Sequence, residues 1–155
     1  MPTRRMFWLI PLLMAVHNAE KAVMTAREAP AQQSVVLPLL VAVGILAIVS
    51  TAVTAIALTG PPRSVRIYLL IALQGLMLCN SVALIWIALQ EGAYQPGLAS
   101  AIVVNLPFTW YCFRRAVRDG FVSLKPMLAV LLATIGIYAA WATVSGMLEC
   151  ASCAS

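Results

Sequence analysis

The stretch VVLPLLVAVGILAIVSTAVTAIALT, residues 35–59, contains no charged residue and decides the fold class. A helix needs roughly 20 mainly apolar residues to cross about 30 Å of hydrocarbon, and this run is long enough to do so. Two more runs, 67–89 and 126–148, meet the same requirement, and a shorter run, 96–113, is also free of charge. The sequence therefore predicts membrane-spanning helices.

The composition of the whole chain agrees. Of its 155 residues, 63% are hydrophobic and 10% are charged, with a mean hydropathy of +0.96, whereas soluble domains carry about 25% charged residues. We find no repeat, low-complexity tract or second domain. We predict an all-α, polytopic transmembrane bundle that forms one domain, 1–155. Its five expected spans lie at about 6–26, 35–59, 67–89, 96–113 and 126–148, with a short outer tail at 149–155.

The first span is the least regular, because its apolar run from Met6 is uninterrupted only to Val16. A cleaved signal peptide is the alternative, since Arg4 and Arg5 precede that run. The residues that follow, HNAEKA, do not provide a small-x-small cleavage site. We therefore expect the segment to be retained as a span.

Loop charges predict the orientation, because cytoplasmic loops carry an excess of Lys and Arg. On one side lie eight such residues: Arg4, Arg5, Arg63, Arg66, Arg114, Arg115, Arg118 and Lys125. The opposite loops offer Arg27 alone, with Lys21 set aside. We predict a multi-pass protein of the cytoplasmic membrane, with its N-terminus inside and its C-terminus outside. The net charge of +5 then follows from topology, and no nucleic-acid partner is needed to explain it.

The stretch MAVHNAEKAVM, residues 14–24, places polar residues inside the first span. His17, the only histidine, shares one helix face with Glu20, Lys21 and Met24. A charge at the centre of a span costs about 2.5–3.5 kcal/mol by insertion scales, so this face requires partners on other helices. At a rise of 1.5 Å per residue, three polar groups fall at a similar depth on three other predicted helices. They are Asn80, Asn105 and Tyr138.

The alternative is that these polar residues have structural roles only. Lys21 is close enough to the outer surface to extend its amine there. Asn80 and Asn105 are of the type that joins membrane helices by hydrogen bonds. Ionisable residues inside a membrane are nevertheless functional-site candidates by default, and their partners are expected on neighbouring helices. Pro107 is expected to kink its helix and to free the carbonyl of Val103 beside Asn105.

Two short motifs resemble those of a known family. His17-Asn18-Ala19-Glu20 is similar to the HXXEE motif that names a family of small integral membrane proteins, and Tyr94-Gln95-Pro96-Gly97 is similar to the Tyr-x-Pro-Gly segment of its members. Asn80 matches an asparagine in the preceding helix. Two positions depart from the family pattern. Lys21 stands where the motif has its second Glu, and Ala83 and Leu84 stand where a second His is expected. The resemblance implies the architecture and the location of a site, without a reaction.

The chemistry expected of the polar face is acid–base catalysis. Glu20, one turn from His17, is close enough to hold one imidazole nitrogen and to fix the tautomer. We predict a cofactor-free isomerase or cyclase acting on a lipophilic small molecule, such as an isoprenoid, sterol or polyketide. His17, Glu20 and Lys21 are the predicted catalytic residues, and Asn80, Asn105, Tyr138 and Met24 the predicted substrate-binding residues.

Two other functions use the same features. The polar face would also serve as the relay of a small transporter or proton-coupled carrier, although no inverted repeat supports it. A membrane assembly subunit would use the polar layer only to hold its helices together. The small residues Ala47, Thr51 and Ala55 recur every four positions and favour tight packing or a homo-oligomer.

The cysteines do not indicate a metal site. Cys150 and Cys153 form a lone CxxC in the predicted outer tail, where a small disulfide, free thiols or lipidation are all open. Cys79 and Cys112 are expected to fill apolar space in the bundle. One His with one Glu is an incomplete ligand set, and we predict no metal.

Overall fold

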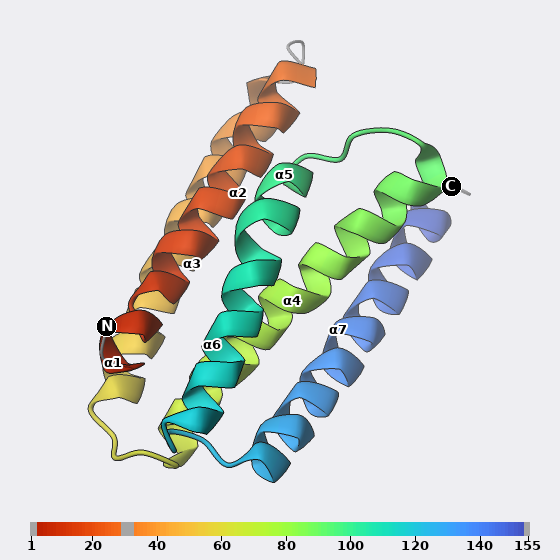
Figure 1. Cartoon of the computed structure of the whole chain (residues 1–155). Helices are drawn as coiled ribbons and strands as arrows, with labels where there is room; N and C mark the ends of the chain where they lie inside the picture. The colour runs from red at the N-terminus through yellow and green to blue at the C-terminus, as the bar shows by residue number, and fades with distance from the viewer. Residues whose placement is uncertain (1–2, 29–32, 154–155) are drawn as a thin grey trace.

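The computed structural model describes the backbone of residues 3–28 and 33–153, and the side chains of residues 3–27 and 37–144. All regular structure in these ranges is helical, which confirms the predicted all-α class. The elements are α1 (Thr3–Phe7), α2 (Leu9–Glu28), α3 (Gln33–Leu58), α4 (Val65–Glu91), α5 (Leu98–Ser100), the π-helix η1 (Ala101–Asn105), α6 (Leu106–Arg118) and α7 (Leu124–Cys153), and Figure 1 labels all of them except η1. The CxxC side chains lie outside the described residues.

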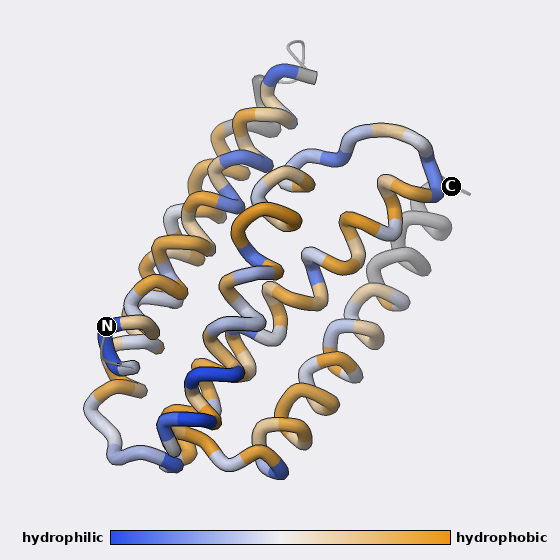
Figure 2. Tube along the Cα trace, in the orientation of Figure 1, coloured by the Kyte–Doolittle hydropathy of each residue, from blue (hydrophilic) through white to orange (hydrophobic). Residues whose placement is uncertain are grey.

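Three helices of the described chain are long enough and apolar enough to cross a membrane. They are Leu37–Leu58 within α3, Val65–Glu91 in α4 and Leu124–Val144 within α7. Their outward faces are apolar, with Ile48 71% and Leu132 69% exposed, and Figure 2 shows hydrophobic residues along most of each helix. These helices correspond to three of the five predicted spans. The other two, 6–26 and 96–113, are helical but stay predictions as spans.

The N-terminal helix is interrupted where the sequence predicted a continuous run. Trp8 separates α1 from α2, and its N–H bonds to the Arg5 carbonyl over 3.2 Å in a tighter turn. Pro11 supplies the physical reason, because it has no N–H to donate to the Phe7 carbonyl four residues earlier. The helix beyond Trp8 continues through His17, Glu20 and Lys21 without a further break.

The helices form a layered bundle with α4 near its centre. α2 packs along α3, whereas α4 contacts α3, η1, α6 and α7. In Figure 1, α7 lies at the opposite edge of the bundle from α2 and α3. The apolar core joins α1 and α2 to α4 and α6, with the fully buried side chains of Phe7, Ile10, Ile71 and Cys112. Cys112 thus fills apolar space, as predicted.

The N-terminus and two loops meet at one end of the bundle, which we call the basic end. Arg4 donates a hydrogen bond to the Gly60 carbonyl over 3.1 Å, and the Arg63 N–H donates one to the Phe121 carbonyl over 2.7 Å. Figure 1 places α1 and the loops 59–64 and 119–123 at this end, and the loop 92–97 at the other. The basic N-terminus and the two basic loops therefore lie at the same end of the bundle.

Pro107 reshapes its helix by a π-turn. α5, η1 and α6 form one uninterrupted run in which the Leu106 N–H bonds to the Ala101 carbonyl, five residues back. Pro107 has no N–H to donate to the Val103 carbonyl, so the regular helical hydrogen bonding is interrupted here, as the sequence predicted. The wider turn carries Asn105 into the bundle, where its side chain is 1% exposed.

Candidate functional site

His17 lies at the centre of the polar site and is fully buried. Its Nδ1 is 2.7 Å from the Ser100 Oγ, at the start of the α5–η1–α6 run. Its Nε2 is 2.8 Å from the Asn80 Nδ2, on α4. Both ring nitrogens therefore have partners, each supplied by a different helix. The predicted contact between Asn80 and the polar face of α2 is present.

Lys21 determines which atoms donate and which accept in this hydrogen-bond network. Its Nζ donates to the Asn80 Oδ1 over 3.1 Å, because an ammonium group has protons and no acceptor. The Asn80 amide must then present its Nδ2 protons to His17, so His17 Nε2 accepts and Nδ1 carries the ring proton. His17 Nδ1 donates to the Ser100 Oγ, which in turn donates to the Gly97 carbonyl over 3.2 Å. One chain of donors thus runs from Lys21 to Gly97.

Glu20 is bound by two groups from the segment 94–100. Its Oε1 accepts the Tyr94 hydroxyl over 2.5 Å, and its Oε2 accepts the Ser100 N–H over 2.9 Å. The expectation that Glu20 holds the His17 ring is wrong. Ser100 lies between the two, bonding the imidazole through its hydroxyl and the carboxylate through its backbone.

Gly97 allows this close approach. Its φ of +91° is a conformation that side-chain-bearing residues rarely adopt. A Cβ at this position would lie 2.8 Å from the Lys21 Cγ and 3.0 Å from the His17 Cε1. The turn that contains Gly97 is therefore in direct contact with the polar face of α2.

The remaining predicted site residues lie apart from this network. Asn105 is buried, and its Nδ2 is 3.4 Å from the Ser81 Oγ, a bond between η1 and α4. Tyr138 packs against Trp141 at 6.0 Å between ring centroids and lines an apolar groove between α4 and α7. Met24 is half-buried on α2. The structure does not bring Tyr138 to His17, because α7 packs on a different face of α4 from α2.

Two residues that complete the site, Ser100 and Tyr94, were absent from the predicted set. Tyr94 belongs to the Tyr-Gln-Pro-Gly segment, which the sequence analysis identified as similar to a family feature. Ser100 lies three residues beyond Gly97 and carries no signal of its own, since a serine in an apolar helix is common. The sequence did not reveal that this turn contacts α2, and without that contact neither residue could be assigned to the site.

A shallow, open apolar groove of about 410 Å³ lies beside Tyr94. Its walls are the end of α4, including Ile85 and Leu89, and the start of the next helical run, including Leu98 and Ile102. Tyr94 thus lines the groove, and its hydroxyl donates a hydrogen bond to Glu20. The groove and the polar network meet at this side chain.

No three His, Cys, Asp or Glu side chains gather into a possible metal site within the described ranges. The predicted absence of a metal stays a prediction, because the CxxC side chains fall outside those ranges. Cys79 and Cys112 are free thiols.

Comparison with known proteins identifies the family of the chain from its sequence. A family model described as "Protein of unknown function with HXXEE motif" matches residues 8–112. The chain belongs to the HXXEE family. No curated protein and no solved structure matches it. The region matched by the HXXEE family contains the whole network from His17 to Ser100, whereas α7 and its Tyr138 lie beyond it.

The HXXEE motif has its second Glu at the position of Lys21 in this chain. A carboxylate there would accept a hydrogen bond from Asn80 instead of donating one. The substitution therefore sets the direction of the hydrogen bonds around His17.

Proposed function

We propose that this HXXEE protein is a cofactor-free, intramembrane acid–base enzyme of the isomerase or cyclase type, acting on a lipophilic molecule such as an isoprenoid, sterol or polyketide. One observation carries the proposal: Tyr94 lines an apolar groove, and its hydroxyl donates a hydrogen bond to Glu20. A pair of proton-exchanging groups at the edge of an apolar site suits a substrate that lacks charge.

The proposed chemistry needs no external electron or proton source. A substrate entering the groove displaces the Tyr94 hydroxyl from Glu20 Oε1, and the carboxylate removes a proton from a carbon beside a carbonyl or double bond. The freed Tyr94 hydroxyl donates a hydrogen bond to the substrate, and Glu20 returns the proton at a second carbon. The double bond moves, and the enzyme is unchanged at the end of the cycle.

His17 has a positioning role in this proposal, because it is fully buried and lies behind Ser100. Its Nδ1 holds the Ser100 hydroxyl, and the Ser100 N–H holds Glu20 Oε2. Lys21 fixes Asn80, which fixes His17. The catalytic residues of the proposal are thus Glu20 and Tyr94, oriented by His17, Lys21, Asn80 and Ser100. Met24, Asn105 and Tyr138 stay proposed substrate-binding residues, without a contact to this network.

Deuterium exchange tests the chemistry without knowledge of the substrate. The purified chain is reconstituted with the total lipid extract of its cells in D₂O, and carbon-bound deuterium is measured by mass spectrometry. We expect protein-dependent labelling of one lipid class. Glu20→Gln should lower it about a hundredfold or more, the usual contribution of a general base. The control Glu91→Gln removes an exposed carboxylate whose partner is the neighbouring Gln95. Labelling that equals that of protein-free vesicles, or that survives Glu20→Gln, would overturn the proposal.

A proton-coupled carrier is the second candidate, favoured by the continuous donor chain from Lys21 to Gly97. A carrier would give proton flux across sealed vesicles that Glu20→Gln abolishes. If the chain is an assembly subunit, Glu20→Gln should instead lower the amount of the protein that accumulates in the membrane, and no measured reaction should be lost. In either case, the stripe of small residues Ala47, Thr51 and Ala55, which lines a shallow groove on α3, is the proposed contact of a homo-oligomer.

The proposed topology has five spans in the cytoplasmic membrane, with the basic end inside. Support comes from the meeting of the Arg-rich N-terminus with the loops 59–64 and 119–123 at one end. The test places single cysteines, Gln95→Cys or Ser123→Cys, in a cysteine-free chain. A membrane-impermeant maleimide on intact cells should label the first variant only, and the opposite pattern would reverse the orientation.

A further inference from the structure

A second polar site lies at the basic end, on α6. Tyr111, Arg114, Arg115 and Arg118 line a cleft of about 200 Å³. These side chains share one stretch of helix, because positions three and four apart lie on the same face. None of them takes part in the network around His17.

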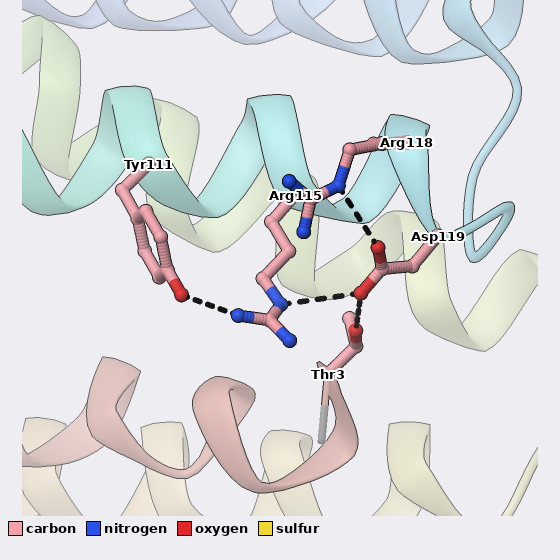
Figure 3. Close-up of polar contacts among 5 residues, drawn as sticks. All are labelled: Thr3, Tyr111, Arg115, Arg118 and Asp119. Carbon is pink, nitrogen blue, oxygen red and sulfur yellow. Dashed lines mark hydrogen bonds and ion pairs between the residues drawn. The ribbon is translucent and has the colours of Figure 1, made fainter. Parts of the chain in front are cut away.

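The cleft has an excess of positive charge. Asp119 accepts hydrogen bonds from Thr3, from Arg115 over 3.1 Å and from Arg118 over 3.3 Å, as Figure 3 shows. Arg115 also donates to the Tyr111 hydroxyl over 2.5 Å. Arg114 has no hydrogen-bond or ion-pair partner among the described residues. The Asp119 carboxylate thus binds two of the three guanidinium groups of the cleft, and that of Arg114 is left over.

The same helix borders a long apolar groove. This groove has a volume of about 570 Å³ and lies between α6 and α7, with Trp110 and Phe113 on one wall and Met127 and Leu128 on the other. Arg114 lines both the groove and the cationic cleft. The two spaces therefore adjoin at one arginine, with cationic groups on one side and apolar groups on the other.

We propose that this composite site binds an anionic phospholipid of the surrounding membrane. The lipid phosphate lies against Arg114 and Arg118, and one acyl chain occupies the groove between α6 and α7. A guanidinium matches a phosphate in charge and in its paired donors. Trp110 and Tyr111 are 71% and 48% exposed, as befits aromatic side chains at headgroup level. A free anion would use the cleft and leave the apolar groove without an occupant.

Native mass spectrometry of the full-length chain in detergent tests the site. The chain is titrated separately with phosphatidylglycerol and with phosphatidylcholine of identical acyl chains. We expect retention of the anionic lipid over the zwitterionic one. Arg114→Gln and Arg118→Gln should each weaken phosphatidylglycerol binding about fivefold, the effect of one basic residue near an anionic lipid. The control is Arg66→Gln, at the same end, whose guanidinium bonds to Thr59 outside the cleft.

Two further measurements distinguish a bound lipid from a bound free anion. Leu128→Trp fills the apolar groove, and we expect it to weaken lipid binding while leaving the circular dichroism spectrum unchanged. Inorganic phosphate is added as a competitor and should not displace the lipid at millimolar concentration. Equal retention of both lipids, or an Arg66→Gln loss equal to that of Arg114→Gln, would overturn the proposal. Displacement by phosphate together with unchanged binding in Leu128→Trp would assign the cleft to a free anion instead.

Discussion

Gly97 lies directly against His17: a side-chain carbon on the glycine would be 3.0 Å from the Cε1 of the imidazole ring. This contact joins the two motifs that the sequence carries 80 residues apart. It also explains why the Tyr-Gln-Pro-Gly turn ends in glycine, since both the backbone angle and the space exclude a larger residue.

The first prediction concerns this contact. Gly97→Ala should destabilise the protein by about 1–3 kcal/mol more than Gly92→Ala, because it adds a steric clash to the backbone strain. Gly92 is the matched control, with a φ of +64° and nothing within 4 Å of an added Cβ. Denaturant unfolding in detergent provides the measurement. Equal losses for the two variants would show that His17 and Lys21 yield to the added methyl group.

The ring proton of His17 provides the second prediction. Because the chain has one histidine, the ¹⁵N spectrum of histidine-labelled protein reports this ring alone. We expect the neutral tautomer with its proton on Nδ1, as the donor chain from Lys21 requires. Lys21→Glu should move the proton to Nε2, because the carboxylate turns the Asn80 amide around. Asn18→Ala, which removes only a bond to the Met14 carbonyl, should leave the tautomer unchanged.

The third prediction tests the buried bond between α4 and α6. Gln74 donates to the Thr109 hydroxyl over 2.5 Å, and both side chains are 2% exposed. A double-mutant cycle of Gln74→Leu and Thr109→Val should give a coupling of about 0.6 kcal/mol, the average for hydrogen bonds inside a membrane protein, and no more than about 1.7 kcal/mol. The control cycle pairs Gln74→Leu with Thr143→Val, an exposed site on α7, and should give a coupling near zero. Similar values for the two cycles would argue against the bond.

The fourth prediction is a pH dependence at the basic end. The hydrogen bond from Thr3, followed by those from Arg118 and Arg115, lowers the pKa of Asp119 below its ordinary value of 3.8. A carboxyl whose pKa is lowered by folding stabilises the fold above its unfolded pKa, and this contribution is lost as the pH falls through the folded pKa. The stability difference between the wild type and Asp119→Asn should therefore be constant above about pH 5 and shrink below pH 3.8.

Thr3→Val is the companion variant for that measurement, because it removes the largest cause of the lowered pKa of Asp119. In this background the folded-state pKa of Asp119 lies closer to its ordinary value, so the loss of stability should be smaller and should end at a higher pH than in the wild type. A difference between wild type and Asp119→Asn that stays constant down to pH 3 would contradict the assignment.

The sequence alone determined the helical class and the approximate limits of each helix. The apolar runs 35–59, 67–89 and 126–148 had to be helical, because an apolar segment in a membrane must bond its backbone internally. It also located the polar face of α2 and named Asn80 as one of three candidate partners, since charged groups at that depth require neighbours. The meeting of the basic loops at one end followed from the charge pattern.

Only the tertiary structure decided which polar groups meet. Ser100 and Tyr94 joined the site because the turn at Gly97 folds onto α2, a long-range contact that no local pattern contains. Tyr138 remained apart, because equal depth places a residue in the same layer without choosing the face of its helix. Depth in the membrane depends on position along the chain, whereas contact depends on how each helix is rotated and packed. That rotation is fixed by the whole bundle together.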